Sequence, residues 1–292
     1  MRRALVIGAS GQIGQSLIPH LLERGDYVFA LSRRDRTSRS ANLEWIRGEL
    51  FAAMPGIPEV DVIFSLGPLN GFAQWLANAR SIGSPRVVAI GSMSAESKHE
   101  SNDPAERELA QTLRRAEKQL AEAAEAKGII WTLLRPTMIY GGGRDRNLTP
   151  LARFGARTHL FPKLFGATGL RQPVHVDDLA LACLAAAALD AASRRSFDLG
   201  GGERLEFSMM LDRVRASLGT LVIPLPIPLV AARAVWAIAL LNHRWRGVGL
   251  GAISRLRADL VANDDAARSL LNWSPRGFRP EAATWRMRSD RI

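Results

Sequence analysis

The chain has 292 residues, a formal charge of +11 and 47% apolar residues, enough for one large α/β domain or a domain with a smaller lobe. The positive charge is almost entirely arginine, scattered along the chain without a basic, aromatic-rich helix, so nucleic-acid binding is not expected. The single cysteine, Cys183, excludes an internal disulfide, and Met1 runs almost directly into an apolar strand, with no room for a signal peptide. These features predict a cytoplasmic protein.

The first predicted elements are a strand over residues 4–7, a glycine-rich turn and a helix over 12–24. In the turn, Gly8 allows the chain to reverse, Gly11 lets the backbone approach phosphates, and Gly14 lets the helix pack closely on the strand. This order places backbone N–H groups and a helix N-terminus against a pyrophosphate. The sequence therefore predicts a dinucleotide-binding turn. The predicted contact residues are Gly8, Ser10, Gly11, Gln12, Ile13 and Gly14.

Strand-like and helix-like segments then alternate along the chain. The predicted strands are 27–31, 60–66, 86–90 and 129–134, and the predicted helices are 71–82 and 104–127. This alternation predicts a parallel, doubly wound sheet.

The helix over 104–127 has well-marked ends. Asp103 is a candidate N-cap, and Gly128 lies just past the last residue. The spacing predicts a single apolar stripe on this helix, formed by Leu109, Leu113, Ala116 and Leu120.

The alternation of strand-like and helix-like segments stops after Tyr140, where a run of three glycines is followed by charged residues. We expect a dinucleotide-binding domain over 1–140 and 173–199, and a smaller, mostly helical substrate lobe over 141–172 and 200–292. The longest apolar segment, 221–241, is interrupted by three prolines and an arginine, so a membrane-spanning helix is not expected. We interpret it as a proline-rich connection and a core helix from about residue 228, with a peripheral membrane contact as the alternative.

Three further motifs follow the glycine turn in a fixed order. They are Lys118-Gln-Leu-Ala-Glu122, Leu134-Arg-Pro-Thr-Met-Ile-Tyr-Gly141 and Pro173-Val-His-Val-Asp-Asp178. Over nearly the whole chain, this pattern resembles the extended short-chain dehydrogenase/reductase superfamily, in particular its NAD-dependent epimerase/dehydratase group. The resemblance implies a Rossmann-type doubly wound parallel sheet, a nicotinamide cofactor and a nucleotide-activated sugar or related phosphorylated substrate. It does not fix the reaction, because this fold hosts many, and a homodimer stays an open expectation.

The resemblance also assigns cofactor-binding positions. Ser32, Arg33 and Arg34 end the second strand, where an acidic residue would bind the ribose hydroxyls of NAD. Arginine there suits the 2′-phosphate of NADP, so NADP is the expected cofactor and NAD the alternative. A solvated basic loop is the other interpretation of these arginines. The remaining positions implied for the cofactor are Glu49 and Leu50 beside the adenine, Leu66 and Gly67 along the far side of the dinucleotide, Lys118 at the nicotinamide ribose, and Pro136.

For the substrate, the resemblance implies two residues. Arg171 stands just before the His-Val-Asp-Asp motif, where such enzymes contact a phosphate, and Asn147 follows the glycine run after Tyr140. Arg144 and Arg146 add positive charge beside Asn147. The alternative is a loop that is simply basic.

The catalytic residues of the superfamily are a Ser or Thr, a Tyr, and a Lys four residues after the Tyr. If Lys118 is that lysine, the tyrosine position holds Arg114, and the only tyrosines, Tyr27 and Tyr140, lie elsewhere. Ser92 and Ser94 are the candidate hydroxyl residues. Arg114 could stabilise a developing alkoxide. Alternatively, Arg114 and Lys118 lie on a solvated helix face, with Lys118 paired to Glu122.

Three functions follow as hypotheses. The first is an NADP-linked oxidoreductase or epimerase with altered acid–base groups. The second is a catalytically silent dinucleotide-binding protein that senses the cofactor or scaffolds a partner. The third is a membrane-surface enzyme that acts on a lipid-linked sugar, suggested by residues 221–257.

Overall fold

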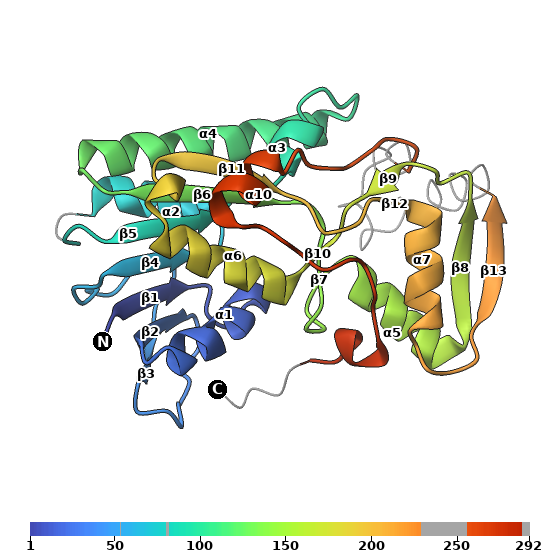
Figure 1. Cartoon of the computed structure of the whole chain (residues 1–292), viewed down its shortest axis with the longest axis horizontal. Coiled ribbons are helices and arrows are strands. Elements are labelled where there is room, and N and C mark those ends of the chain that lie inside the picture. The colour runs from blue at the N-terminus through green and yellow to red at the C-terminus, as the bar shows by residue number, and fades with distance from the viewer. Residues whose placement is uncertain (53, 80–81, 229–255, 288–292) are drawn as a thin grey trace.

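A seven-stranded parallel sheet forms the centre of the protein (Figure 1). The computed structural model describes residues 1–52, 54–79, 82–228 and 256–287. The strands are β1 (Arg3–Ile7), β2 (Tyr27–Ser32), β3 (Leu43–Arg47), β4 (Val62–Ser65), β5 (Arg86–Ile90), β6 (Trp131–Pro136) and β11 (Arg195–Leu199). Their order is β11-β6-β5-β4-β1-β2-β3, which reverses between β1 and β4. In such sheets, ligands bind outside the carboxyl ends of the strands at this reversal.

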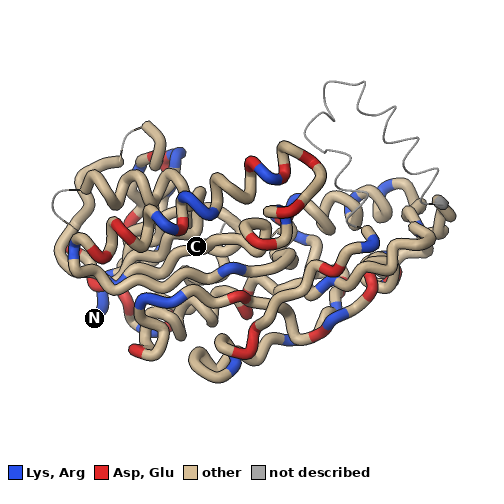
Figure 2. The backbone as a smooth tube through the Cα atoms, turned by 90° about the horizontal axis from the view of Figure 1, so that it is seen from above, with Lys and Arg blue, Asp and Glu red and all other residues tan. Residues whose placement is uncertain are grey.

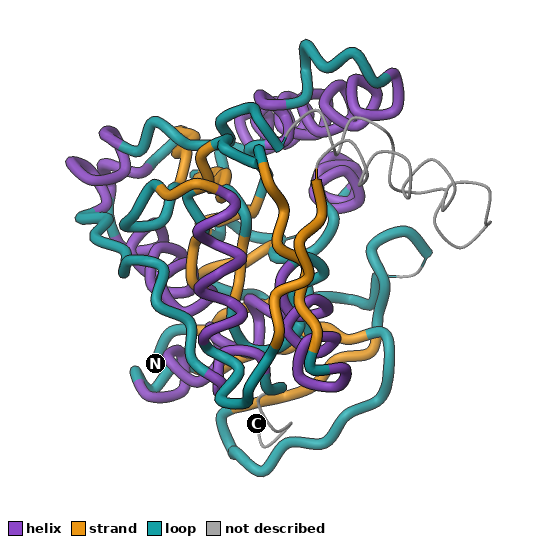
Figure 3. Tube along the Cα trace, turned by 90° about the vertical axis from the view of Figure 1, so that its right-hand side faces the viewer, coloured by secondary structure: helices purple, strands orange, loops and turns teal. Residues whose placement is uncertain are grey.

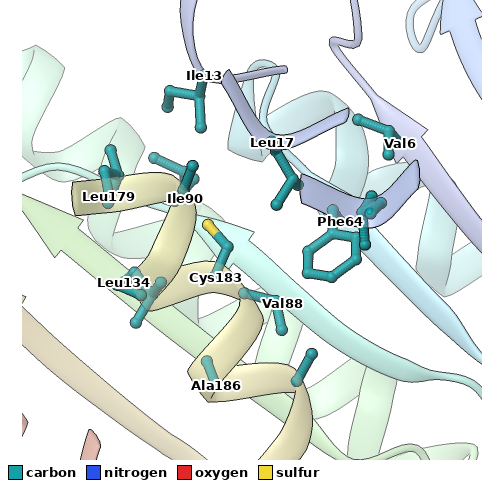
Figure 4. Close-up of a cluster of buried hydrophobic side chains, with 14 of the residues drawn as sticks. Val6, Ile13, Leu17, Phe64, Val88, Ile90, Leu134, Leu179, Cys183 and Ala186 are labelled. Carbon is teal, nitrogen blue, oxygen red and sulfur yellow. The ribbon is translucent and has the colours of Figure 1, made fainter. Parts of the chain in front are cut away.

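Helices cover both faces of the sheet (Figure 1). The first face packs on α1 (Gln12–Glu23) and α6 (Val176–Ala188), and the second on α2 (Leu69–Asn78) and α4 (Pro104–Ala126). Successive strand residues alternate between the two cores, so Val6 lies in the same core as Leu17 of α1 while Leu5 lies in the same core as Leu120 of α4 (Figure 4 shows the first core). Burial on both faces explains the continuous apolar runs from which these strands were predicted.

The prediction of a Rossmann-type doubly wound parallel sheet is confirmed. The strand β3 was not predicted, because it is an edge strand in which Leu43 is buried while Glu44 is exposed. The ends of α4 are as predicted: the Asp103 side chain accepts a hydrogen bond from the Ala105 N–H at 2.9 Å, and Gly128 has a positive φ of 67°.

The predicted apolar stripe of α4 is partly wrong. Leu109 is 42% exposed, whereas Glu106 and Glu117 are both buried. The buried face of this helix therefore carries charge, which a pattern of apolar spacing does not reveal.

The rest of the described chain forms a smaller lobe with its own core. It contains α5 (Leu148–Thr158), β8 (Leu160–Phe165), α7 (Phe207–Ala216), β13 (Ile223–Pro228) and the 3₁₀ turn Ala282–Trp285. The helix α10 (Asp265–Leu271) instead packs in the first core of the sheet, beside α6 and β11. Short strand pairs connect the lobe with the sheet, namely β7 (Ile139–Tyr140) with β10 (Val174–His175), and β9 (Leu170–Arg171) with β12 (Leu205–Glu206). The domain boundaries at 140, 173 and 199 stay a prediction. Lys and Arg are distributed along most of the described chain (Figure 2).

The predicted proline-rich connection after residue 221 is wrong, because Ile223–Pro228 is a strand that pairs in parallel with β8. The Ile223 N–H donates to the His159 carbonyl at 2.8 Å, so every second N–H points toward β8. Pro224, Pro226 and Pro228 occupy the alternate positions, where the missing N–H faces away from β8.

The predicted core helix from about residue 228 lies outside the described residues. Among the residues that the structure describes, no helix is both long and apolar enough to cross a membrane.

Candidate cofactor and active site

The turn between β1 and α1 has room only for glycine at its key positions. Gly8 has a φ of +82°, and a Cβ there would lie 3.0 Å from the backbone of Leu66 and Gly67 after β4. A Cβ on Gly14 would lie 2.5 Å from the Ala9 carbonyl oxygen, so α1 packs directly on the turn. Gly11 caps α1 without a side chain. A helix N-terminus approached by bare backbone is the feature that binds a pyrophosphate.

The remaining turn residues lie at the same place. The side chains of Ser10 and Gln12 are half-buried and that of Ile13 is buried. Gln12 donates from Nε2 to the Gly141 carbonyl at 2.9 Å, which links the turn to the glycine run after β7. The structure therefore brings the turn next to the segment in which substrate residues were predicted.

The chain leaves β2 through Ser32, Arg33 and Arg34, the residues expected to bind the adenosine ribose. Ser32 is buried, and its Oγ accepts a hydrogen bond from the Arg34 N–H at 3.3 Å. Arg33 and Arg34 are exposed, and the Arg33 guanidinium lies 3.9 Å from the Glu49 carboxylate. Leu50 approaches Gly67 within ordinary contact distance, since a Cβ on Gly67 would lie 3.7 Å from its Cδ1. The loops after β2, β3 and β4 thus meet at one edge.

Sequence analysis missed Phe51 at this edge. Its side chain is 58% exposed, and a Cβ on Gly71 would lie 2.7 Å from the Phe51 ring, so the ring rests on the bare backbone at the start of α2. The sequence does show an aromatic residue directly after Glu49 and Leu50, the pair expected beside the adenine. Its position could not be inferred, because the preceding strand β3 had not been predicted.

Ser92, Ser94 and Pro136 lie together at the carboxyl ends of β5 and β6. The Met93 N–H between the two serines donates to the Pro136 carbonyl at 3.2 Å, and the Ser94 N–H donates to the Ser92 Oγ at 3.1 Å. The short helix α3 (Ser94–Ser97) follows directly. Its Glu96 lies 2.8 Å from the Arg114 guanidinium, so Arg114 is placed next to the candidate serines.

Lys118 is placed on the outer side of α4. Its side chain is 77% exposed, and its Nζ lies 3.7 Å from the Glu122 carboxylate, the ion pair that the sequence left open. Its contact with the nicotinamide ribose stays a prediction.

The adjacent Glu117 faces the sheet and anchors a charged cluster that sequence analysis did not find. Its carboxylate accepts hydrogen bonds from the Arg135 guanidinium of β6: Nε donates to both carboxylate oxygens at 3.1 Å, and Nη2 donates to Oε2 at 2.6 Å. A Cβ on Gly91 would lie 3.1 Å from Glu117 Oε1, so the cluster lies directly under the end of β5. Asp198 of β11 completes it, 3.6 Å from Arg135.

Burial and the neighbouring charges shift the pKa values of Arg135 and Asp198 in this cluster. Burial would lower the pKa of Arg135, but the hydrogen bonds and charge of Glu117 outweigh it and raise this pKa above its ordinary value. Burial also raises the pKa of Asp198, and the nearby Arg135 offsets this only in part.

Both tyrosines lie away from α4. Tyr27 begins β2 at the amino end of the strand, where its hydroxyl donates to Glu44 at 3.1 Å. Tyr140 is 1% exposed and lies between the rings of His175 and Phe278, and burial raises its pKa well above the usual range. Neither phenol stands one helical turn before Lys118.

The predicted substrate residues lie in different surroundings. Asn147 is exposed at the N-terminus of α5, whose first N–H groups are capped by the buried Asp145. Arg171 is 3% exposed, stacks on Phe207 and donates from Nη1 to the Leu170 and Ala258 carbonyls at 2.8 Å. Its guanidinium therefore holds lobe segments together, and its contact with a substrate phosphate stays a prediction.

An open hollow of about 640 Å³ lies elsewhere in the lobe, between α7 and residues 277–280. Glu203, Arg213 and Phe278 are among its lining residues, whereas neither Asn147 nor Arg171 lines it. Among the described residues, no cluster of His, Cys, Asp or Glu could hold a metal ion.

Comparison with known proteins agrees with this geometry. The sequence profile of a family described as NAD(P)H-binding matches residues 8–153, half of the chain. The uncharacterized protein y4nG of Sinorhizobium fredii (strain NBRC 101917 / NGR234) is 26% identical over 269 residues, covering 82% of this chain and 67% of that protein.

Two solved structures are similar over nearly their whole length. MoeE5 in complex with UDP-glucuronic acid and NAD has a TM-score of 0.70 and 20% identity, with 97% of each chain covered. UDP-glucuronic acid 4-epimerase from Bacillus cereus in complex with NAD has a TM-score of 0.70 and 14% identity, with 97% of this chain and 96% of that chain covered. The chain thus has the fold of the extended short-chain dehydrogenase/reductases and belongs to the NAD(P)H-binding family.

Proposed function

We propose that the protein is an NADP-dependent oxidoreductase or epimerase that acts on a nucleotide-activated sugar. The observation that carries this proposal is the glycine turn, where a Cβ on Gly8 or Gly14 would collide with backbone and where α1 begins without a side-chain cap. These residues fit a dinucleotide pyrophosphate, which needs close backbone approach and free N–H groups.

The choice of NADP rests on the end of β2. Arg33 and Arg34 are exposed there, and no carboxylate follows Ser32 directly to accept hydrogen bonds from the ribose hydroxyls. The ion pair of Arg33 with Glu49 is long and exposed, so a dianionic 2′-phosphate can take Glu49's place. Arg33 and Arg34 then hold that phosphate by charge-assisted hydrogen bonds.

The substrate class is supported by the solved structures. MoeE5, which is similar over 97% of both chains, was solved with a UDP-sugar and NAD. In this chain, Asn147 and the neighbouring Arg146 are exposed, and they follow the glycine run whose Gly141 carbonyl accepts the hydrogen bond from Gln12. They are the groups we assign to a nucleoside diphosphate, together with Arg171.

When bound, the nicotinamide supplies hydride transfer. The Ser92 hydroxyl accepts from the Ser94 N–H and keeps its own proton to donate to a substrate oxygen. Arg114 stays charged near neutral pH, so it cannot act as a base and instead balances negative charge that develops on the substrate. Proton exchange then falls to a serine or to water.

A catalytically silent cofactor sensor or scaffold is the second candidate. It is favoured by α4, where Arg114 is paired with Glu96 and Lys118 with Glu122, so that both cations of the expected active site already have carboxylate partners. A titratable phenol is also missing from this helix.

One experiment separates the two candidates. NADPH is titrated into the protein, and the loaded protein is then assayed for turnover with a panel of UDP- and dTDP-sugars. Binding with turnover supports the enzyme, whereas binding without turnover supports the sensor. If neither NADPH nor NADH binds, both proposals fall. Gly14→Val is the matched negative variant, since its side chain would push α1 off the turn.

A further inference from the structure

The loops that follow β1, β2, β3 and β4 leave the sheet side by side. The Leu66 N–H donates to the Ile7 carbonyl at 2.9 Å, and the Gly48 N–H donates to the Ser32 carbonyl at 3.0 Å. The ends of β1 and β2 are level as well, since Ile7 pairs with the next-to-last residue of β2. The first residues of the four loops therefore form one row at the carboxyl ends of the strands. Figure 3 is viewed from the side of the lobe, toward which these ends point.

This row restricts where the adenine of a bound cofactor lies. On the proposed function, on which this inference rests, the pyrophosphate lies at the glycine turn after β1 and the 2′-phosphate at Arg33 and Arg34 after β2. In NADP, the pyrophosphate arm, the 2′-phosphate and the adenine are all attached to one ribose. With the first two groups held by the loops after β1 and β2, the adenine is left with the adjoining loops after β3 and β4.

The Phe51 ring lies where these two loops meet. Phe51 follows Glu49, which pairs with Arg33, and Leu50, which approaches Gly67. It is 58% exposed and belongs to neither core of the sheet. A ring that served only to cover α2 would be buried against it, whereas most of Phe51 is open to solvent.

The ring is held in place from one side. A Cβ on Gly71, in the first turn of α2, would lie 2.7, 2.8 and 3.1 Å from Cζ, Cε1 and Cε2 of Phe51. Three ring carbons at nearly equal distances mean that Gly71 faces the flat side of the ring and not its edge. One face of the ring therefore rests on bare backbone, and the exposed surface belongs to the rest of the ring. A larger residue in place of Gly71 would push the ring away.

Trp45, a second aromatic residue near this row, is used elsewhere. It packs against the first core of the sheet, and the Arg36 guanidinium lies over its ring at 5.2 Å. Leu50 packs against the second core, on the opposite side of the sheet. Phe51, next to Leu50, is thus the ring that a base on this side can reach.

We propose that Phe51 is the stacking platform for the adenine of the cofactor. Gly71 supports one face of the ring, and the adenine packs on the other. Stacking of a base on an aromatic ring needs no hydrogen bonds to the base, and every base offers a flat face for it. The ring therefore contributes affinity for the adenosine half of the cofactor and none for the nicotinamide half.

The test is calorimetric titration of the full chain with NADPH and with adenosine 2′,5′-bisphosphate, which carries the adenosine half alone. Phe51→Leu keeps an apolar side chain but removes the ring, and it should weaken both ligands by the same factor, about tenfold. Phe51→Tyr keeps the ring and should bind both ligands as wild type does. Gly71→Ala keeps Phe51 but displaces its ring, so it should also weaken both ligands.

The matched control is Phe154→Leu, which changes a 50% exposed phenylalanine on α5 and should leave both affinities unchanged. Circular dichroism and urea unfolding confirm that each variant keeps the fold. If Phe51→Leu binds NADPH as tightly as wild type, the stacking proposal is wrong while the cofactor site stands. A loss for NADPH without a loss for adenosine 2′,5′-bisphosphate also overturns it, because the ring would then act on the nicotinamide half. If wild type binds neither ligand, the proposed function itself fails.

Discussion

Arg33 directly follows β2, with 79% of its side chain exposed and its guanidinium 3.9 Å from Glu49. We predict that the protein binds NADPH more tightly than NADH and that Arg33→Ala removes most of this difference. Charge-assisted hydrogen bonds to the 2′-phosphate of about 1.5–3 kcal/mol correspond to a tenfold to hundredfold preference. Calorimetric titration of both cofactors against wild type and variant measures it.

Arg24→Ala is the control for this prediction, because Arg24 is also exposed but lies at the far end of α1. It should leave both affinities unchanged. Equal affinity of wild type for NADPH and NADH would show that the two arginines form only a solvated basic loop.

Lys118 and Glu122 allow the two interpretations of α4 to be tested at single residues. If Lys118 binds the nicotinamide ribose, Lys118→Ala lowers NADPH affinity while Glu122→Ala does not. If the lysine belongs only to its exposed ion pair, both variants leave affinity unchanged and alter stability by less than about 1 kcal/mol. The measurements are NADPH titration and urea unfolding. We predict the first outcome.

Arg114→Tyr extends this test to the chemistry. A positioned acid–base group contributes about a hundredfold to ten-thousandfold in rate. Restoring a phenol four residues before Lys118 should therefore raise turnover strongly if the rest of the site is intact. An unchanged rate, together with intact NADPH binding, would place the reaction outside the superfamily mechanism.

At the scale of the element, α4 shows how two neighbouring residues on a helix, Glu117 and Lys118, come to have different surroundings and different roles. Glu117 and Lys118 are adjacent in sequence but lie about 100° apart around the helix axis. Glu117 is buried against Arg135, while Lys118 is exposed. The contact of Glu117 with Arg135 joins the helix to β6, so its loss should affect the packing of α4 on the sheet.

We predict opposite effects for the two carboxylates around Arg135. Glu117→Gln leaves the arginine without its charged hydrogen-bond partner and should destabilise the protein by about 3–5 kcal/mol. Asp198→Asn should stabilise it at neutral pH, because burial raises the pKa of Asp198 and the charged form opposes folding. Urea unfolding of both variants measures these effects.

The sign of the second effect fixes its pH dependence. A raised pKa in the folded state means that the protonated carboxyl is compatible with folding and that stability is lost as pH rises through that pKa. The advantage of Asp198→Asn should therefore shrink as pH falls toward the ordinary pKa of aspartate, about 3.9. A variant less stable than wild type at neutral pH would show that the attraction to Arg135 outweighs burial.

Sequence patterns predicted the elements that are buried on both faces or that have marked ends. The central strands are apolar on both faces, and α4 carries clear end signals, so these elements were found. The edge strand β3 alternates between buried and exposed residues over only five positions. In β13, the prolines suggested a connection, because a sequence does not show on which side of a strand a partner lies. The Glu117–Arg135 pair was missed because it joins distant positions in the chain through side-chain orientation.

At the scale of the whole molecule, the candidate site also contains one part that a local sequence pattern reveals and one part that depends on contacts between distant segments. The glycine turn could be predicted because it is a local backbone feature, and the structure places it at the carboxyl end of β1, where the strand order reverses between β1 and β4. The substrate residues depend on how the lobe meets this end of the sheet, which no local pattern specifies. Arg171 illustrates the difficulty. Its place in the motif resembles that of a phosphate-binding arginine, but here its guanidinium donates hydrogen bonds to the Leu170 and Ala258 carbonyls of the lobe.

The last prediction concerns a ligand that needs both parts of the molecule. We expect UDP to bind the NADPH-loaded protein beside the glycine turn, with Asn147 and Arg171 as ligands. Asn147→Ala should weaken UDP about threefold to tenfold, the effect of one or two hydrogen bonds, without changing stability. Arg171→Ala should weaken it and also lower the melting temperature, because the Leu170 and Ala258 carbonyls lose their donor.

Calorimetry with UDP at two salt concentrations measures this, since binding to a phosphate weakens with salt. Asn78→Ala, an exposed amide at the end of α2, is the control and should change nothing. If UDP and dTDP both give no heat with a protein that binds NADPH, the substrate assignment is wrong while the cofactor assignment stands. If Arg171→Ala lowers the melting temperature but leaves UDP affinity unchanged, Arg171 only supports the lobe.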